Sequence, residues 1–171
     1  MDRINTIPIE TISSRETGST TQNAHPETTS QPEFRNVYVI GVFDLFHRGH
    51  LELLKNAKAL GQRLIVAVNG DEMVSRYKRK PFFNEQDRLA IIEACKYVDD
   101  AFIIKDFDNK AYLEQYGIDA IVHGNDWERS SYLKQIRVTE EYLAENEVSL
   151  VLLPYTQGVS TSELINQIKN L

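Results

Sequence analysis

Residues 37–60 read VYVIGVFDLFHRGHLELLKNAKAL, and this stretch is the clearest indication of the fold class. Its first seven residues form an apolar run, which is typical of a strand buried on both faces. Apolar residues then recur at helical spacing from Leu51 to Leu60, which predicts a helix over 47–60 with Gly61 as its C′ residue. A buried strand followed directly by a helix is the first half of a βαβ unit.

The same alternation of strand and helix continues along the chain. Short apolar strands are predicted at 36–42, 63–68, 101–104, 120–123 and 148–153. Helices are predicted at 47–60, 84–98 with Asn84 as N-cap, 110–116, 132–146 and 160–171, and a loop at 71–83. Right-handed crossovers between such strands give an α/β fold, a doubly wound (Rossmann-like) five-stranded parallel sheet with helices on both faces.

The first 33 residues differ in composition from the rest. Eleven of them are Ser or Thr, three of the chain's five prolines lie among them, and aromatic residues are absent. Such a segment buries too little apolar surface to offset the entropy lost on ordering, so 1–33 is predicted to be a disordered tail and 34–171 the folded domain. Its isoleucines leave open a short extended piece that docks on the domain; they are Ile4, Ile7, Ile9 and Ile12.

The chain of 171 residues carries a formal net charge of −6 and one cysteine, Cys95. The negative charge argues against nucleic acid or an anionic membrane as partner, because both need a basic surface. A lone cysteine forms no intramolecular disulfide, and Cys95 is expected to be a small buried residue within a helix. With neither an apolar run of transmembrane length nor a signal-peptide core, a cytoplasmic protein is expected.

His47 and His50 lie where the first strand passes into the first helix. A helix N-terminus has unpaired N–H groups and partial positive charge, and side chains three positions apart share one side of the turn. Gly49 lets phosphates approach the backbone. A histidine at a helix start is usually a surface or capping residue, but the position after a buried strand favours a polyphosphate site. Fixed donors there would assist displacement at an α-phosphate.

A basic cluster at 76–80 stands out on this acidic chain, and Arg88 follows it. Lysine offers a mobile point charge and arginine a planar fork, so the cluster is interpreted as a clamp on phosphates, with a solvated loop as the alternative. Arg88 is a cation near a helix start, against the preference that the helix dipole sets. This placement suggests that Arg88 grips pyrophosphate.

Two further motifs follow predicted strands. Residues 123–127 read HGNDW, interpreted either as a turn with a packed tryptophan or as a surface that recognises the base or the acceptor. Residues 155–162 read YTQGVSTS, a good helix N-cap that also offers hydroxyl and N–H donors to phosphates. Because ligands of such sheets bind beyond the carboxyl ends of the strands, these motifs are expected to meet in one crevice.

Alternatives based on a metal or a nucleophile are weaker. His47, His50 and His123 form a three-histidine set, but no strong acid lies at ligand spacing, so no protein metal site is predicted. A Mg²⁺ ion bound through a nucleotide triphosphate is expected instead. Cys95 is expected in mid-helix, which argues against a Cys–His nucleophile.

Together these residues resemble the cytidylyltransferase branch of the HIGH-type nucleotidyltransferases, and within it most closely the glycerol-3-phosphate cytidylyltransferases. The phosphocholine, phosphoethanolamine and phosphonate-activating cytidylyltransferases are similar as well. The resemblance runs from Val37 to the C-terminus. It rests on GVFDLFHRGH at 41–50, Lys78 ten residues before Arg88, GNDW at 124–127 and TQGVSTS at 156–162.

The resemblance implies a role for each matching residue. Catalysis falls to His47, His50, Lys78 and Arg88. Nucleotide binding falls to Val42, Phe43, Gly49, Lys80, Asp126, Trp127, Thr156, Gly158, Ser160 and Thr161. Acceptor binding falls to Lys78 and Lys110. The chain departs from the family motifs at Tyr155 and Lys96, which replace arginines, and at Gln157 and Asn125, which replace acids.

The reaction that the resemblance implies transfers CMP from CTP to a small phosphorylated or phosphonylated alcohol and releases pyrophosphate. A homodimer is implied, without nucleic acid or membrane as partner. One alternative is an ATP-dependent adenylyltransferase that acts on a sugar phosphate or a flavin precursor. The other is a non-catalytic nucleotide-binding regulatory module, which the missing arginine at Tyr155 favours.

Overall fold

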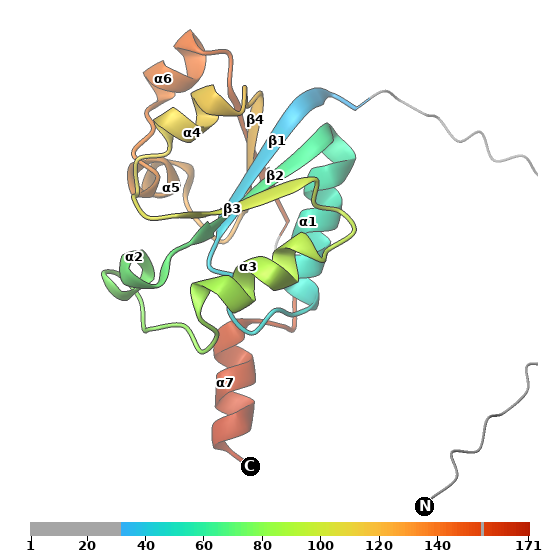
Figure 1. Cartoon of the computed structure of the whole chain (residues 1–171), viewed down its shortest axis with the longest axis vertical. Coiled ribbons are helices and arrows are strands. Elements are labelled where there is room, and N and C mark those ends of the chain that lie inside the picture. Colours follow the sequence, from blue (N-terminus) through green and yellow to red (C-terminus); the bar gives the residue numbers. More distant parts are fainter. Residues whose placement is uncertain (1–31, 155) are drawn as a thin grey trace, which may run out of the picture. The chain divides into compact units, whose positions relative to one another are not determined.

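The computed structural model describes residues 32–154 and 156–171 (Figure 1). This part of the chain contains five strands and seven helices. The strands are β1 (Phe34–Gly41), β2 (Gly61–Asn69), β3 (Asp100–Ile104), β4 (Ala120–Gly124) and β5 (Ser149–Leu153). The helices are α1 (Arg48–Leu60), α2 (Asp71–Ser75), α3 (Glu85–Glu93), α4 (Lys110–Gln115), α5 (Arg129–Gln135), α6 (Glu140–Glu145) and α7 (Thr161–Lys169). Each strand predicted from the sequence is confirmed, with small shifts of its ends.

The strands form one all-parallel sheet in the order β3-β2-β1-β4-β5. The central strand β1 pairs with β2 on one edge and with β4 on the other. The chain therefore winds outward from β1 in both directions, and the predicted doubly wound α/β fold is confirmed. In such a sheet the strand order switches beside β1, and the carboxyl ends there are where ligands bind.

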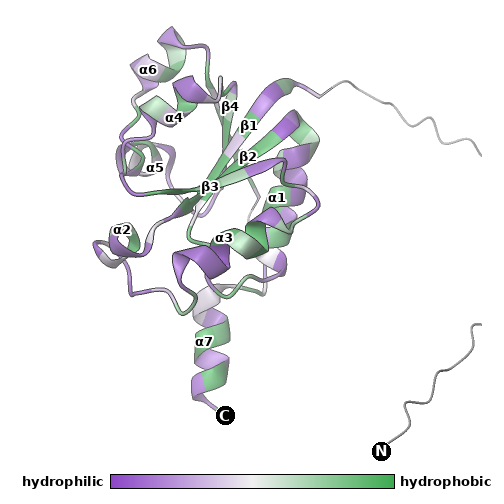
Figure 2. Cartoon of the chain, in the orientation of Figure 1, coloured by the Kyte–Doolittle hydropathy of each residue, from purple (hydrophilic) through white to green (hydrophobic). Residues whose placement is uncertain are grey.

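Alternate residues of β1 face two separate hydrophobic clusters, as a strand covered on both sides requires. Tyr38 and Ile40 belong to the cluster under α4, α5 and α6, whereas Val37 and Val39 belong to the cluster under α1 and α3. Figure 2 shows the strands as largely hydrophobic and the helices as mixed in character. The two covered faces hold β1 in place and so fix where the turn after it emerges.

Two helix predictions and one loop prediction were wrong. The helix predicted at 132–146 is two helices, α5 and α6, because Arg137 adopts a left-handed backbone (φ 55°) and Thr139 caps α6 through Tyr142 N–H. The loop predicted at 71–83 contains the short helix α2. The helix predicted at 84–98 begins as expected at Asn84, which caps α3, but ends at Glu93.

Cys95 therefore lies beyond α3 and is half-buried, outside the helix in which it was expected. Gly61 is not a left-handed C′ residue either, because its φ is −137° and it begins β2. A Cβ at this position would lie 2.4 Å from Cγ2 of Val37. Gly61 is thus needed for close packing against β1.

No helix among the described residues is both long and apolar enough to cross a membrane. The tail predicted at 1–33 lies outside the described residues, apart from Pro32 and Glu33. Tyr155, where a family arginine was expected, lies outside them as well.

Candidate active site

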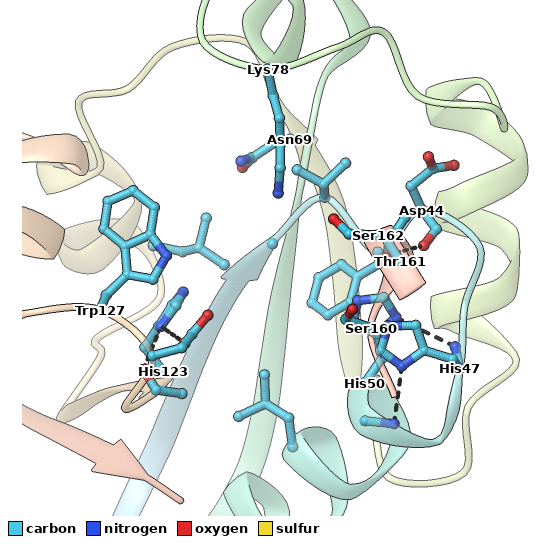
Figure 3. A pocket seen from close by; sticks show the side chains of 18 of the residues that line it. Asp44, His47, His50, Asn69, Lys78, His123, Trp127, Ser160, Thr161 and Ser162 are labelled. Atoms are coloured by element: carbon cyan, nitrogen blue, oxygen red, sulfur yellow. Dashed lines mark hydrogen bonds and ion pairs between the residues drawn. The ribbon is translucent and has the colours of Figure 1, made fainter. Parts of the chain in front are cut away.

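A pocket of about 360 Å³ opens at the carboxyl ends of β1, β2 and β4, a volume suited to a small-molecule ligand (Figure 3). Its walls come from the β1–α1 turn, the segment after α2, the β4–α5 turn and the start of α7. Most of the predicted site residues line it. They are Val42, Phe43, His47, Gly49, His50, Lys78, Asp126, Trp127, Thr156, Ser160 and Thr161.

The two signature histidines, His47 and His50, form a reciprocal capping box at the start of α1. His47 is the N-cap, and its Nδ1 accepts a hydrogen bond from Gly49 N–H at 3.1 Å. Nδ1 of His50 in turn accepts from His47 N–H at 3.4 Å, and the two rings stack with centroids 3.9 Å apart. Because Nδ1 is the acceptor in both rings, each neutral imidazole carries its proton on Nε2 and can donate it to a ligand.

The surroundings keep both rings neutral. Burial lowers the pKa of His50 to about 3, and the neighbouring His47 and Lys78 act in the same direction. Burial also lowers the pKa of His47. The aromatic rings of Phe43 and Phe46 lie against His50, at centroid distances of 5.4 and 5.5 Å. The pocket therefore presents two N–H donors that need no protonation.

The turn that carries these rings has an unusual backbone. Phe43 and Leu45 adopt positive φ angles of 56° and 48°, a region that residues with a side chain rarely occupy. Such conformations cluster at binding and active sites, where the surrounding structure imposes them. At Gly49 a Cβ would lie 2.9 Å from Cε1 of His47, so this glycine makes room for the histidine ring.

The start of α7 is tied directly to the same turn. Ser160 caps α7 by accepting from Glu163 N–H, and Oγ1 of Thr161 donates to the carbonyl oxygen of Asp44 at 3.0 Å. The N-termini of α1 and α7 therefore face one pocket, as predicted, and Figure 3 shows the 160–162 segment beside the two histidines. Two helix N-termini with unused N–H groups favour an anionic ligand.

Asp44 fixes the basic segment at 76–80, a role that was not predicted from the sequence. Its carboxylate accepts from the N–H groups of Phe82 and Phe83 and from Arg79 at 2.9 Å. Burial alone would raise the pKa of Asp44, but these hydrogen bonds lower it, so the carboxylate stays charged. Arg79 and Lys78 both line the pocket. The only sequence cue to this role is the position of Asp44 inside GVFDLFHRGH. Its partners lie 35 to 39 residues further along the chain, so spacing does not reveal them.

Arg88 does not line the pocket, contrary to its predicted grip on pyrophosphate. Its side chain is fully buried, and its guanidinium donates to backbone oxygens at the ends of β1 and β2. These are the carbonyls of Val42 at 2.6 Å and Asn69 at 2.8 Å, with further bonds to Phe83 O and to the Asp71 carboxylate. Arg88 is thus a positioning residue that joins the two strands under the site.

Three other predicted site residues also lie outside the pocket lining. Lys80 is exposed next to Pro81, which does line the pocket. Gly158 has a φ of 76° and forms the turn that leads into α7, where only glycine is unstrained. Lys110 donates to the carbonyl of Arg137 and pairs with Asp108, so the structure gives it no contact with the pocket.

The β4 side of the pocket is aromatic. His123 lies against Tyr132, with ring centroids 4.1 Å apart, and edge-on to Trp127. Figure 3 shows His123 and Trp127 on the opposite side from His47 and His50, so the three histidines do not gather. Nor do the described residues contain any group of three or more His, Cys, Asp or Glu side chains arranged to hold a metal ion.

Comparisons with known proteins agree with this geometry. Residues 38–167 match the family model described as Cytidylyltransferase-like. Glycerol-3-phosphate cytidylyltransferase of Bacillus subtilis (strain 168) is 33% identical over 139 residues, which cover 80% of this chain and 99% of that protein. Ethanolamine-phosphate cytidylyltransferase of Dictyostelium discoideum is 33% identical over 141 residues, but these are 82% of this chain and 38% of that protein.

A solved structure shares the fold. It is a lipopolysaccharide core biosynthesis protein from Thermoplasma volcanium GSS1, with a TM-score of 0.60 and 29% identity over 72% of this chain and 98% of that one. The family match spans the sheet, both helix N-termini and the pocket. By sequence and by structure, the chain belongs to the cytidylyltransferase-like family of nucleotidyltransferases.

Proposed function

We propose that this chain transfers CMP from CTP to a small phosphorylated or phosphonylated alcohol, such as glycerol 3-phosphate, and releases pyrophosphate. The observation that carries the proposal is the meeting of two neutral histidine donors, two helix N-termini and Lys78 in one pocket. Each of these groups can donate hydrogen bonds to phosphate oxygens. Relatives named for glycerol 3-phosphate and ethanolamine phosphate support the acceptor class.

In the proposed reaction a phosphoryl oxygen of the acceptor attacks the α-phosphorus of CTP. The new P–O bond forms as the bond to the bridging oxygen breaks, and pyrophosphate leaves with the electron pair. His47 and His50 donate hydrogen bonds from Nε2 to the oxygens on which charge develops, and Lys78 and Arg79 balance that charge. Donors fixed before the reaction need no reorganisation, so positioning and electrostatics supply the catalysis.

We propose that Mg²⁺ enters with the triphosphate. Its chemistry there is to neutralise phosphate charge. The carboxylate of Asp44 is already occupied by Arg79 and two backbone N–H groups. The described residues therefore fit a metal ion held mainly by phosphate oxygens and water, which is the mode that Mg²⁺ prefers.

The remaining features of the proposal come from the family resemblance and from the substrate. We propose a homodimer, which light scattering of the purified protein tests. CTP as substrate and the single cysteine support a cytoplasmic location. The net charge of −6 supports a protein that binds neither nucleic acid nor an anionic membrane.

The decisive experiment measures pyrophosphate release from CTP and from ATP. Each nucleotide is paired with glycerol 3-phosphate, phosphoethanolamine, phosphocholine, hydroxyethylphosphonate and a sugar phosphate. We expect turnover with CTP and at least one of these acceptors. Turnover with ATP and a sugar phosphate instead would establish the adenylyltransferase alternative. Tight binding of CTP without turnover on any acceptor would identify a regulatory module.

A further inference from the structure

Asn69 and Tyr77 form a hydrogen-bonded pair at the carboxyl end of β2. Nδ2 of Asn69 donates to the Tyr77 hydroxyl at 2.8 Å, and both residues line the pocket. Asn69 is 4% exposed, yet its Oδ1 has no hydrogen-bond partner among the described residues. A buried amide oxygen is normally bonded, so an orphan beside a ligand pocket indicates that the ligand supplies the partner.

The pair is held in place from both ends. The buried guanidinium of Arg88 donates to the backbone oxygen of Asn69 at 2.8 Å. The ring of Tyr77 packs edge-on against Phe107, with centroids 5.6 Å apart. Burial raises the pKa of Tyr77, so its hydroxyl keeps its proton at neutral pH. The two polar groups are thus preorganised rather than adaptable.

The hydrogen-bonding capacity left in the pair matches an alcohol. With Asn69 donating to Tyr77, the amide oxygen remains as a free acceptor and the Tyr77 hydroxyl as a free donor. If the amide were turned over, the hydroxyl would donate to its oxygen, and the pair would still offer both an N–H donor and an oxygen acceptor to a ligand. An alcohol also has one donor and at least one acceptor. A primary ammonium group has three donors and no acceptor.

The charges around the pair also disfavour an ammonium group. Lys78 follows Tyr77 and lines the same pocket, and Figure 3 shows Lys78 and Asn69 together on one side of it. Two of the described lining residues are carboxylates. Asp44 is already paired with Arg79, and Asp126 lies in the turn after β4, across β1 from the end of β2. The Asn69 side of the pocket therefore offers one cation and two neutral polar groups.

We propose that Asn69 and Tyr77 recognise a hydroxyl group of the acceptor, and that the acceptor is a hydroxylated organic phosphate or phosphonate rather than an aminoalkyl phosphate. The inference rests on the proposed function and adds to it which group of the acceptor the pocket recognises. Lys78 attracts the acceptor's phosphoryl group, and the pair selects what that group is attached to.

The test compares two acceptors that differ only in hydroxyl groups, glycerol 3-phosphate and propyl phosphate, with CTP as donor. We expect the wild-type chain to prefer glycerol 3-phosphate by about 100-fold in kcat/KM, because a site built for a hydroxyl rejects an analogue that lacks it. In Tyr77→Phe and Asn69→Leu this preference falls at least about tenfold, while the KM for CTP stays within about twofold. A preference unchanged in both variants overturns the proposal.

A third variant is expected to shift the preference of the pocket from a hydroxyl group to an ammonium group. Asn69→Asp keeps the shape but supplies a carboxylate, so the ratio of kcat/KM for phosphoethanolamine over glycerol 3-phosphate rises at least about tenfold. Tyr97→Phe removes the same hydroxyl outside the pocket lining and leaves both ratios at the wild-type value. Circular dichroism and thermal midpoints show which variants are folded. A wild-type preference for phosphoethanolamine also contradicts the proposal.

Calorimetry separates this proposal from the proposed function. If wild type releases no pyrophosphate with any acceptor, the proposed function fails. The two phosphates are then titrated into the chain saturated with CTP. Tighter binding of glycerol 3-phosphate than of propyl phosphate, lost in Tyr77→Phe, supports hydroxyl recognition. Equal binding of both refutes it.

Discussion

Each signature histidine uses one ring nitrogen for the fold and leaves the other for a ligand. Nδ1 of His50 and Nδ1 of His47 accept backbone N–H groups that the start of α1 would otherwise leave unpaired. Nε2 of each ring then remains as a donor at the pocket. A change of either residue is therefore expected to affect both the helix start and the reaction, and experiments must separate the two effects.

Replacing His50 tests its role as a donor to the transferred phosphate. For His50→Ala we expect kcat to fall by about 10²–10³-fold, the loss typical of one fixed donor to a developing oxyanion. Arg48→Ala is the control, because Arg48 is exposed in the same turn and does not line the pocket. Steady-state kinetics with CTP and the best acceptor provide the measurement. A kcat within threefold of wild type would rule out the donor role.

The pH dependence of stability follows from the same ring. The pKa of His50 is about 3 in the folded chain, against 6.5 for an ordinary histidine. As the pH falls below about 6.5 the unfolded chain binds the proton first, so the contribution of the neutral ring is complete above that pH and is lost toward pH 3. Urea unfolding at pH 7.5, 6 and 4.5 should show this decline. His50→Asn should show a smaller decline, and an equal decline would assign it to other groups.

The carboxylate of Asp44 holds the basic segment at 76–80 against the pocket. Removing the charge of this carboxylate is expected to release the segment. In Asp44→Asn the ion pair with Arg79 is lost, and we expect kcat/KM to fall at least about tenfold because Lys78 and Arg79 lose their fixed position. Trypsin should then cleave within 76–80 faster than in wild type. Asp108→Asn, which alters a carboxylate outside the pocket lining, serves as control. Unchanged cleavage would show that Asp44 does not hold the segment.

Arg88 joins α3 to the ends of β1 and β2, so its loss is expected to act through stability. Arg88→Met leaves two strand carbonyls without their partner and should lower the free energy of unfolding by roughly 3–5 kcal/mol. Arg63→Met, which removes a half-exposed arginine 3.9 Å from Asp100, should change it by less than about 1 kcal/mol. Denaturant titration measures both. A folded Arg88→Met of wild-type stability with impaired kcat would instead support the direct contact with phosphate.

The strands could be predicted from the sequence because each is a short apolar run bounded by Gly, Asn, Pro or charged residues. The helix boundaries were harder. The left-handed backbone of Arg137 that separates α5 from α6 has no marker in the sequence, and the only cue to the break is Thr139 followed by two acids, a helix-start pattern inside a longer helical one. Helix α2 is a single short turn without a clear period.

The site could be predicted where its residues sit in local motifs. Helix N-termini brought His47, His50, Ser160 and Thr161 to the expected pocket. The partners formed by long-range contacts could not be predicted. Spacing does not reveal that Arg88 is buried against strand carbonyls, or that Asp44 faces Arg79. A charged residue is expected at the surface until a structure shows what it pairs with.

For the molecule as a whole, the described residues have two hydrophobic clusters of their own, one on each face of the sheet. We therefore expect a chain that starts at residue 32 to keep a thermal midpoint within about 2 °C of the full chain and a KM for CTP within about twofold. Differential scanning calorimetry and initial rates test this. A midpoint lowered by more than about 5 °C would favour the alternative in which isoleucines of the tail dock on the domain.

The central place of β1 has a consequence for how the chain reaches its native state. One edge of β1 is paired as soon as β2 follows α1, but the other waits for β4, where Ala120 lies opposite Val37. Until then an apolar strand carries a row of free amides and carbonyls, which can pair with another chain. Late closure of distant contacts slows folding and lengthens this exposure. Dilute, cool refolding conditions therefore suit this topology, since encounters between half-formed sheets become rarer.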